Sequence, residues 1–132
     1  MVIYQGSVYG MNDVTHLGFQ DIPMLSNIPN LVYLAPATKE EYLAMLDWSM
    51  EQTSYSVAIK LPGGPMISDG SRVTKDFGRL NRYEVAQTGE KIAIIGLGTF
   101  FELAKEAAKL LKKEAGINAT IILSLIHISE PT

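Results

Sequence analysis

The sequence predicts an α/β fold built from parallel-sheet βαβ units, and three observations carry this prediction. Two apolar runs are each followed by a turn and then by a segment with helical periodicity. Each helical segment leads into another apolar run, so the order is strand, helix, strand. Glycine- and proline-containing turns separate the segments. Because a crossover that contains a helix joins parallel neighbours in a sheet, we expect two successive parallel units.

The first unit starts with a strand over residues 32–35. Thr38 stands three residues before Glu41, which is the spacing of a helix-capping box. Over residues 39–52 apolar residues recur at helical spacing and predict a helix whose buried face is made of Tyr42, Leu43, Leu46 and Met50. Residues 56–61 are the next predicted strand, since a Pro-Gly-Gly-Pro turn follows directly.

The second unit starts with residues 91–96, a continuous β-branched run that is typical of a strand buried on both faces of a parallel sheet. We expect this strand to be central. A tight turn over residues 96–99 leads into a helix whose Leu and Ala stripe, residues 103–111, is expected in the core. Gly116 ends the helix, and residues 119–122 begin the next parallel strand.

Composition excludes several classes of protein. The 132 residues are 47% hydrophobic and 19% charged with a net charge of −3, which gives no basic surface for nucleic acid. The absence of cysteine excludes disulfides and thiolate metal sites. No stretch approaches the roughly 20 apolar residues that span a bilayer. We therefore expect a cytoplasmic protein that binds neither nucleic acid nor a membrane.

The most informative segment is the polar loop Gly-Met-Asn-Asp-Val-Thr-His-Leu-Gly of residues 10–18, which precedes Asp21 and the Ile-Pro…Ala-Pro run of residues 28–36. This order resembles the pyrimidine-binding domain of the transketolase family of thiamine-diphosphate enzymes. Within that family it is most like the 1-deoxy-D-xylulose-5-phosphate synthases, whose pattern there is Gly-x-Asp-Gly-x-Thr-His-x-Gly-x-Phe-Asp. The resemblance spans residues 1 to about 122, a minor part of the family's full length.

The resemblance implies three segments. Residues 1–66 are the C-terminal part of a transketolase-like pyrimidine-binding domain, and residues 67–122 are the N-terminal part of a transketolase C-terminal domain. Residues 123–132 resemble translated sequencing-adapter read-through and are expected to be a non-native tail, so His127 is set aside. Met1 opens directly into a strand, as expected of an internal residue of a longer protein.

The resemblance also implies a function. It is that of a thiamine-diphosphate-dependent transferase that condenses pyruvate, with decarboxylation, onto glyceraldehyde 3-phosphate in isoprenoid precursor synthesis. Family members use thiamine diphosphate and Mg²⁺ and are homodimers with active sites between subunits. The family's metal-binding segment and activating glutamate have no counterpart here. We therefore expect no cofactor-binding or metal-binding residues, and no activity from the fragment alone.

Two alternatives stay open. The first is a transketolase, or the C-terminal half of a split transketolase, which moves a ketol unit between sugars. The second is a non-catalytic α/β module that binds a partner. A dinucleotide site at Gly96-Leu97-Gly98 is disfavoured, because Phe101 stands where the third glycine of that motif would be.

His16 is the candidate catalytic residue. It stands at the family's Thr-His position, where the imidazole faces the reacting carbon of the cofactor and can assist proton transfer near neutral pH. Its structural alternative is a loop histidine that hydrogen-bonds to the backbone. Thr15 is expected to shape the loop, and Asp13 to bind backbone amides, as aspartates in turns often do.

The chain departs from the family at two arginines. Gln5 and Gly63 stand where the deoxyxylulose-phosphate synthases have them. Arginine suits a phosphate because it offers a charge and a fork of donors. Their absence puts a phosphorylated acceptor in doubt. Lys60 could substitute as a point charge, although a lysine at a strand end is expected to be solvated.

Overall fold

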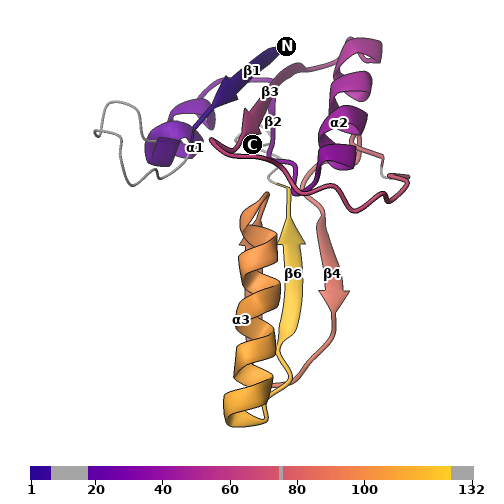
Figure 1. Ribbon diagram of the computed structural model, residues 1–132. Helices are drawn as coiled ribbons and strands as arrows, with labels where there is room; N and C mark the ends of the chain where they lie inside the picture. Colours follow the sequence, from indigo (N-terminus) through magenta and orange to yellow (C-terminus); the bar gives the residue numbers. More distant parts are fainter. Residues whose placement is uncertain (7–17, 75, 126–132) are drawn as a thin grey trace.

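The structure, a computed structural model, describes residues 1–6, 18–74 and 76–125. Its strands form two three-stranded sheets that lie one beyond the other, each with a long helix beside it (Figure 1). The first sheet has the order β1-β3-β2, with strands Val2–Gln5, Ser56–Leu61 and Leu31–Leu34. The second has the order β4-β6-β5, with strands Tyr83–Gln87, Thr120–Ser124 and Ala93–Leu97. The predicted α/β class is confirmed.

The first sheet is fully parallel, as predicted. Val32 of β2 pairs with Val57 of β3, and Tyr4 of β1 pairs with Lys60 on the other side of β3. Helix α2 (Lys39–Glu51) is the crossover between β2 and β3. A 3₁₀ turn, η2 (Gly18–Gln20), and the short helix α1 (Asp21–Leu25) precede β2. The predicted βαβ unit is therefore present.

The capping interaction predicted for α2 is confirmed. Thr38 Oγ1 accepts a hydrogen bond from the Glu41 N–H at 3.2 Å, which satisfies one of the free donors of the first turn. The Glu41 carboxylate reaches back and accepts from the Ala37 N–H at 2.8 Å. Glu41 is buried, and the residues one and two turns on, Met45 and Ser49, are buried as well.

The predicted buried face of α2 was wrong in part. Leu43 and Met50 are exposed, because the helix turns Glu41, Met45 and Ser49 toward the sheet. Hydrophobic spacing favoured the larger apolar residues. Hydrogen bonding explains the difference, since Glu41 is held inward by its bond to Ala37 and the Ser49 hydroxyl donates to the Met45 carbonyl.

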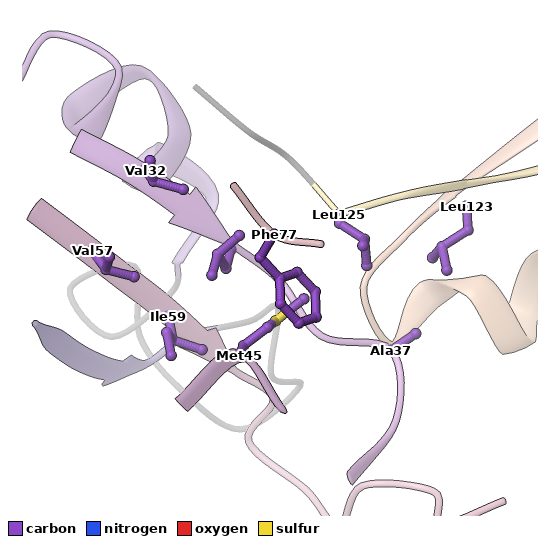
Figure 2. Close-up of a cluster of buried hydrophobic side chains, with 9 residues drawn as sticks. Val32, Ala37, Met45, Val57, Ile59, Phe77, Leu123 and Leu125 are labelled. Atoms are coloured by element: carbon purple, nitrogen blue, oxygen red, sulfur yellow. The ribbon is translucent and has the colours of Figure 1, made fainter. Parts of the chain in front are cut away.

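The two faces of the first sheet bury different side chains, as alternation along strands requires. One face packs under α2 in a cluster around Met45 (Figure 2), to which β2 and β3 contribute Val32, Leu34, Val57 and Ile59. The other face holds a smaller cluster with Leu25 of α1 at its edge, made of Leu31, Tyr33, Ala58 and Tyr4. The sheet is therefore covered on both sides at β2.

The second sheet has a parallel pair, β5 and β6, joined by helix α3 (Phe100–Ala115), while β4 is antiparallel to β6. The expectation of a central strand over residues 91–96 was wrong. β6 is the central strand, and β5 is an edge strand of the described sheet with Ile95 63% exposed. A β-branched run fits a central strand or an edge strand equally well. The order of the strands is decided by β4, which pairs with β6 and not with β5.

Helix α3 ends at Gly116, as predicted, with a φ of +67° that glycine adopts without strain. The expectation that the whole stripe of residues 103–111 lies in the core was wrong. Ala104 and Ala108 are buried against the sheet, whereas Leu103 and Leu110 are exposed. Small residues allow close approach of the helix to the sheet, so the alanines lie inside. Among the described residues, no helix is both long and apolar enough to cross a membrane.

Leu123 and Leu125 join the two sheets. Both side chains enter the cluster around Met45, together with Phe77 of the connecting segment (Figure 2). The Ala35 N–H donates to the Leu125 carbonyl at 3.0 Å. Thus β6 runs on through the first residues of the segment 123–132, for which we predicted a non-native tail. Residues 126–132, including His127, lie outside the described residues.

Candidate functional site

A cavity of about 170 Å³ lies where the carboxyl ends of β1, β3 and β5 meet. Open α/β sheets bind their ligands outside the carboxyl ends of parallel strands. The residues that shape it are Gly6, Gly18, Lys60, Pro62, Gly98 and Thr99. Side chains of both sheets contribute, so the cavity lies between the two βαβ units.

The turn between β5 and α3 reaches the first sheet because it is made of glycines. A Cβ on Gly96 would lie 2.6 Å from Phe101 Cα, so only glycine lets the helix return this tightly over the strand. Gly98 has a φ of +51°, and a Cβ there would lie 3.1 Å from the Ala35 carbonyl oxygen. The Gly-Leu-Gly segment is therefore a tight strand-to-helix turn, as expected, and forms one wall of the cavity.

Gly6 and Gly18, which flank residues 7–17, touch each other at the opposite wall. A Cβ on Gly18 would lie 2.8 Å from Gly6 C and 2.9 Å from Gly6 Cα. It would also lie 2.4 Å from Asp21 Oδ2. The carboxylate of Asp21 thus occupies the space beside both glycines. Two backbones and a side chain meet here at a distance that no residue with a Cβ permits.

Lys60 holds this contact from β3. Its Nζ donates to the Gly18 carbonyl at 2.9 Å and lies 3.0 Å from Asp21 Oδ2. The side chains of Lys60 and Asp21 are 20% and 16% exposed, so water screens the pair only partly. The expectation of a solvated lysine was wrong, because the register that places Lys60 beside Tyr4 also turns its ammonium toward η2 and α1.

The two positions at which the family has arginines carry no charge here. Gln5 Nε2 donates to the Pro62 carbonyl at 3.3 Å, and Gly63 is exposed. Among the described residues that line the cavity, Lys60 is the only basic one. Its charge is balanced by Asp21. The walls are otherwise mainly apolar, with Ile22, Leu97 and Phe100 among them.

Tyr33 of β2, which is fully buried, and Tyr4 of β1, which is partly buried, lie on the two strands that flank β3 in the first sheet. The rings of Tyr4 and Tyr33 are 6.1 Å apart between centroids, and neither hydroxyl has a hydrogen-bond partner among the described residues. Burial is the main cause that raises the pKa of Tyr33 to about 12, and it raises the pKa of Tyr4 as well. The negative charge of Asp21 adds to both increases.

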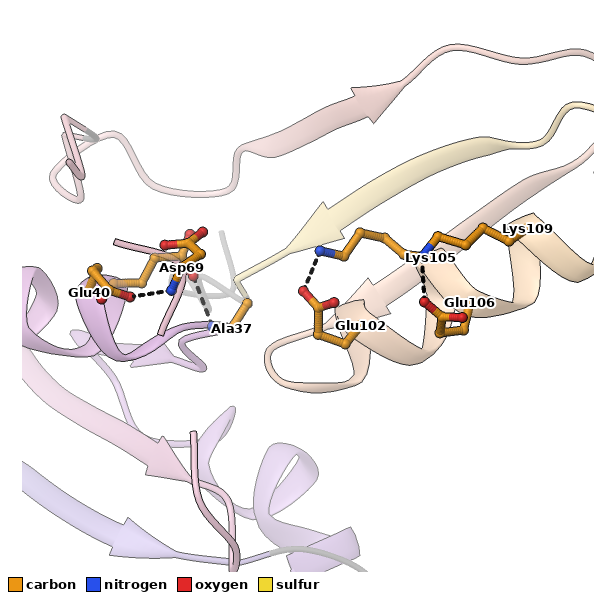
Figure 3. A network of polar contacts seen from close by, with 8 residues as sticks. Ala37, Glu40, Asp69, Glu102, Lys105, Glu106 and Lys109 are labelled. Atoms are coloured by element: carbon orange, nitrogen blue, oxygen red, sulfur yellow. Dashed lines mark hydrogen bonds and ion pairs between the residues drawn. The ribbon is translucent and has the colours of Figure 1, made fainter. Parts of the chain in front are cut away.

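A second polar group lies at the start of α2 (Figure 3). Glu40 accepts from the Ser68 hydroxyl and, at 3.3 Å, from the Asp69 N–H. These bonds, that of Ser68 first, lower the pKa of the Glu40 carboxyl. The bonds of Glu40 to Ser68 and Asp69 fasten the connecting segment to the helix. No group of three or more His, Asp or Glu side chains within residues 1–6, 18–74 and 76–125 is placed to hold a metal ion.

The predicted catalytic residue, His16, lies outside the described residues, as do Thr15 and Asp13. Of the motif that pointed to them, the structure describes Gly18 and Asp21, and it brings both together with Lys60. Sequence reasoning missed the ion pair and the two tyrosines. Lys60 is positioned by the pairing of β1 with β3, in which Tyr4 and Lys60 are partners. These strands are far apart in the chain, so the pairing could not be predicted from local sequence.

Comparison with known proteins gives consistent relatives. The chain is 34% identical to 1-deoxy-D-xylulose-5-phosphate synthase of Clostridium acetobutylicum over 125 residues, covering 91% of this chain and 20% of that enzyme. The synthase of Trichormus variabilis is 31% identical and covers 89% of this chain and 19% of its own. The chain thus spans about a fifth of the length of these curated relatives. No family model matches it.

Solved structures agree on the fold. A split-gene transketolase, described as an inactive β4 tetramer, superposes with a TM-score of 0.70 at 26% identity, covering 93% of this chain and 37% of that one. A transketolase variant of Pichia stipitis gives a TM-score of 0.76 over 95% of this chain and 18% of its own, at 23% identity, which supports the fold alone. With synthases similar in sequence and transketolases similar in architecture, the chain is a segment of a protein of the transketolase family.

Proposed function

We propose that this chain is the part of a thiamine-diphosphate-dependent transferase that forms one side of its active site. The proposed reaction is that of the similar synthases, the decarboxylating condensation of pyruvate with an aldehyde. The observation that carries it is 34% identity over nearly the whole chain, together with a cavity at the carboxyl ends of parallel strands. We assign residues 1–66 to the pyrimidine-binding domain and residues 67–122 to the C-terminal domain.

The described residues do not fit the diphosphate of the cofactor or its metal. They contain no metal-ligand cluster, and the single lysine at the cavity is paired with Asp21. We therefore assign the groups that hold thiamine diphosphate and Mg²⁺ to other parts of the full-length protein, including the partner subunit of a homodimer. In such an enzyme the cofactor supplies the electron sink.

The residues of this chain would position and shield the reactants. The apolar walls of the cavity exclude water, which strengthens electrostatic interactions inside. His16 is the proposed proton-transfer residue. It stands two residues along the chain from Gly18, which lines the cavity and is fixed by Lys60. Its imidazole would accept or donate a proton near neutral pH.

The test is His16→Ala in the full-length protein. With pyruvate and an aldehyde as substrates, we expect kcat to fall by about 10² to 10⁴, the usual contribution of general acid–base catalysis. Circular dichroism should show an unchanged fold. Thr53→Ala, an exposed position remote from the cavity, is the control and should leave kcat unchanged. Unchanged turnover in His16→Ala would remove this residue from the active site.

A second candidate is a transketolase, which the 26% identity to the split-gene transketolase favours. The same protein decides between them. A synthase consumes pyruvate and releases carbon dioxide in the condensation with the aldehyde, whereas a transketolase transfers a two-carbon ketol unit from a ketose and does not use pyruvate. Turnover of a ketose donor without pyruvate would favour the second candidate. Absence of both reactions would favour a non-catalytic module.

A further inference from the structure

We propose that the cavity between β3 and β5 receives an uncharged acceptor, a small aldehyde or hydroxyaldehyde without a phosphate group. The inference rests on the proposed function and concerns the substrate class of the same site. It follows from the charges at the cavity, from the bonds that the polar side chains already make, and from the apolar character of the walls.

The charges at the cavity are balanced. Among the described lining residues, Lys60 is the only cation, and its Nζ lies 3.0 Å from Asp21 Oδ2. Its ammonium also donates to the Gly18 carbonyl at 2.9 Å. Two of its donors are thus committed inside the protein. A phosphate dianion entering the cavity would meet a lysine whose charge is already offset by the Asp21 carboxylate beside it, so the net attraction would be weak.

No other basic side chain of the segments that flank the cavity supplies a free positive charge. Residues 7–17, between Gly6 and Gly18, contain neither lysine nor arginine, and the same holds for residues 61–71. Gln5 is turned to the Pro62 carbonyl, and Gly63 has no side chain. A phosphate is held by several charge-assisted bonds, most effectively from arginine forks. This wall of the cavity offers none.

The start of α3, at the other wall of the cavity, carries a partial positive charge. Glu102, in the first turn of the helix, forms an ion pair with Lys105, so the side chains there add no net charge that would attract an anion. Thr99 makes no capping bond with its side chain, so its hydroxyl remains a donor or acceptor at the cavity. A hydroxyl or carbonyl of a neutral acceptor fits such a group, while Ile22, Leu97 and Phe100 fit its carbon chain.

The kinetic experiment compares D-glyceraldehyde with D-glyceraldehyde 3-phosphate as acceptors for the full-length protein. We expect kcat/KM for the neutral aldehyde to equal or exceed that for the phosphate. Gly63→Arg, an exposed position with open space around the neighbouring Gly64, should raise the preference for the phosphate by about tenfold, the effect of one charge-assisted bond. Lys39→Met, an exposed lysine away from the cavity, is the matched control.

A clear preference of the unmodified protein for the phosphorylated aldehyde would overturn the inference. So would a rise in KM for that acceptor alone in Lys60→Met, since it would show that Lys60 binds phosphate. Loss of turnover with every acceptor would instead count against the proposed function.

A binding measurement tests whether the cavity binds phosphate even if the protein shows no turnover. Inorganic phosphate is added to the isotope-labelled 132-residue chain, and the amide signals of Gly98 and Thr99 are followed by NMR. We expect no saturable shift in the unmodified chain, and a saturable shift in Asp21→Asn, where Lys60 loses its carboxylate partner. A saturable shift in the unmodified chain that Lys60→Met abolishes would reject the inference.

Discussion

Lys60 and Asp21 are 39 residues apart in the chain, yet their side chains form a partly buried ion pair at 3.0 Å beside the contact between Gly6 and Gly18. Lys60 belongs to the central strand of the first sheet, and Asp21 opens α1. The pair therefore fastens the segment before β2 to the sheet. It also neutralises the only basic side chain among the described lining of the cavity.

Removing one member of this pair should destabilise the protein more than removing both. Lys60→Met leaves Asp21 partly buried without its cation, and we expect a loss of about 1–3 kcal/mol in the free energy of unfolding, less than for a fully buried pair. Urea denaturation of Lys60→Met, Asp21→Asn and the double variant completes a thermodynamic cycle. Strictly additive losses would show that the two side chains do not interact in solution.

Gly18→Ala should be strongly destabilising. The new Cβ would meet Asp21 and the Gly6 backbone at distances below 3 Å, so either the ion pair or the backbone contact must shift. Overpacking of this kind costs about 1–3 kcal/mol. Gly64→Ala is a matched control, because nothing lies within 4 Å of its Cβ position. Thermal unfolding of both variants checks the prediction, and equal melting temperatures would contradict the described contact.

Tyr33→Phe should be neutral or stabilising, although Tyr33 is fully buried. Its hydroxyl has no hydrogen-bond partner among the described residues, so the phenylalanine removes a polar group that burial disfavours. We expect a gain of up to about 1 kcal/mol in the free energy of unfolding. A loss of more than about 1 kcal/mol in Tyr33→Phe would mean that the hydroxyl is hydrogen-bonded in solution.

The same residue predicts a pH dependence at the alkaline end. Burial raises the pKa of Tyr33 from 10.0 to about 12, so the folded state favours the neutral phenol. Its contribution to stability is complete below pH 10 and is lost as the pH rises through the folded-state value. Tyr33→Phe should therefore lose less stability than the unmodified protein between pH 10 and 12. Tyr83 is 72% exposed, so Tyr83→Phe should show the same pH dependence of stability as the unmodified protein.

Thr38→Ala should destabilise α2 by about 1 kcal/mol, the usual cost of losing an N-cap side chain. Its Oγ1 accepts from the Glu41 N–H, and Glu41 in turn holds the Ala37 N–H. Thr99 occupies the same position at α3 but makes no capping bond. Thr99→Ala therefore serves as the control and should change the melting temperature little. Equal effects of the two substitutions would argue against the cap at Thr38.

Local signals in the sequence were sufficient where the structure is local. The cap at Thr38, the stop at Gly116 and the turn at Gly98 were all predicted, because each depends on a few neighbouring residues. The choice of buried side chains was not. Leu103 and Leu110 carry the stronger hydrophobic signal, but Ala104 and Ala108 face the sheet, since helix-to-sheet distance selects small residues.

The candidate site was predictable only through its motif. Gly18 and Asp21 were identified as part of a family pattern; the structure places Gly18 at the cavity wall and Asp21 directly beside it. Lys60 was noted, but its bond to Asp21 depends on the pairing of β1 with β3 and on the direction of α1. Contacts between segments so far apart have no signature in a single sequence. The buried tyrosine pair is missing from the prediction for the same reason.

The hydrogen bond from Ala35 to Leu125 has a consequence for how the molecule melts. Leu123 and Leu125, at the end of the second sheet, complete the hydrophobic cluster under α2. Both sheets contribute to this one cluster, so the unfolding of either sheet exposes apolar side chains of the other. We therefore expect cooperative unfolding, in which fluorescence of Trp48 beside the first sheet and far-ultraviolet dichroism dominated by α3 change at the same denaturant concentration.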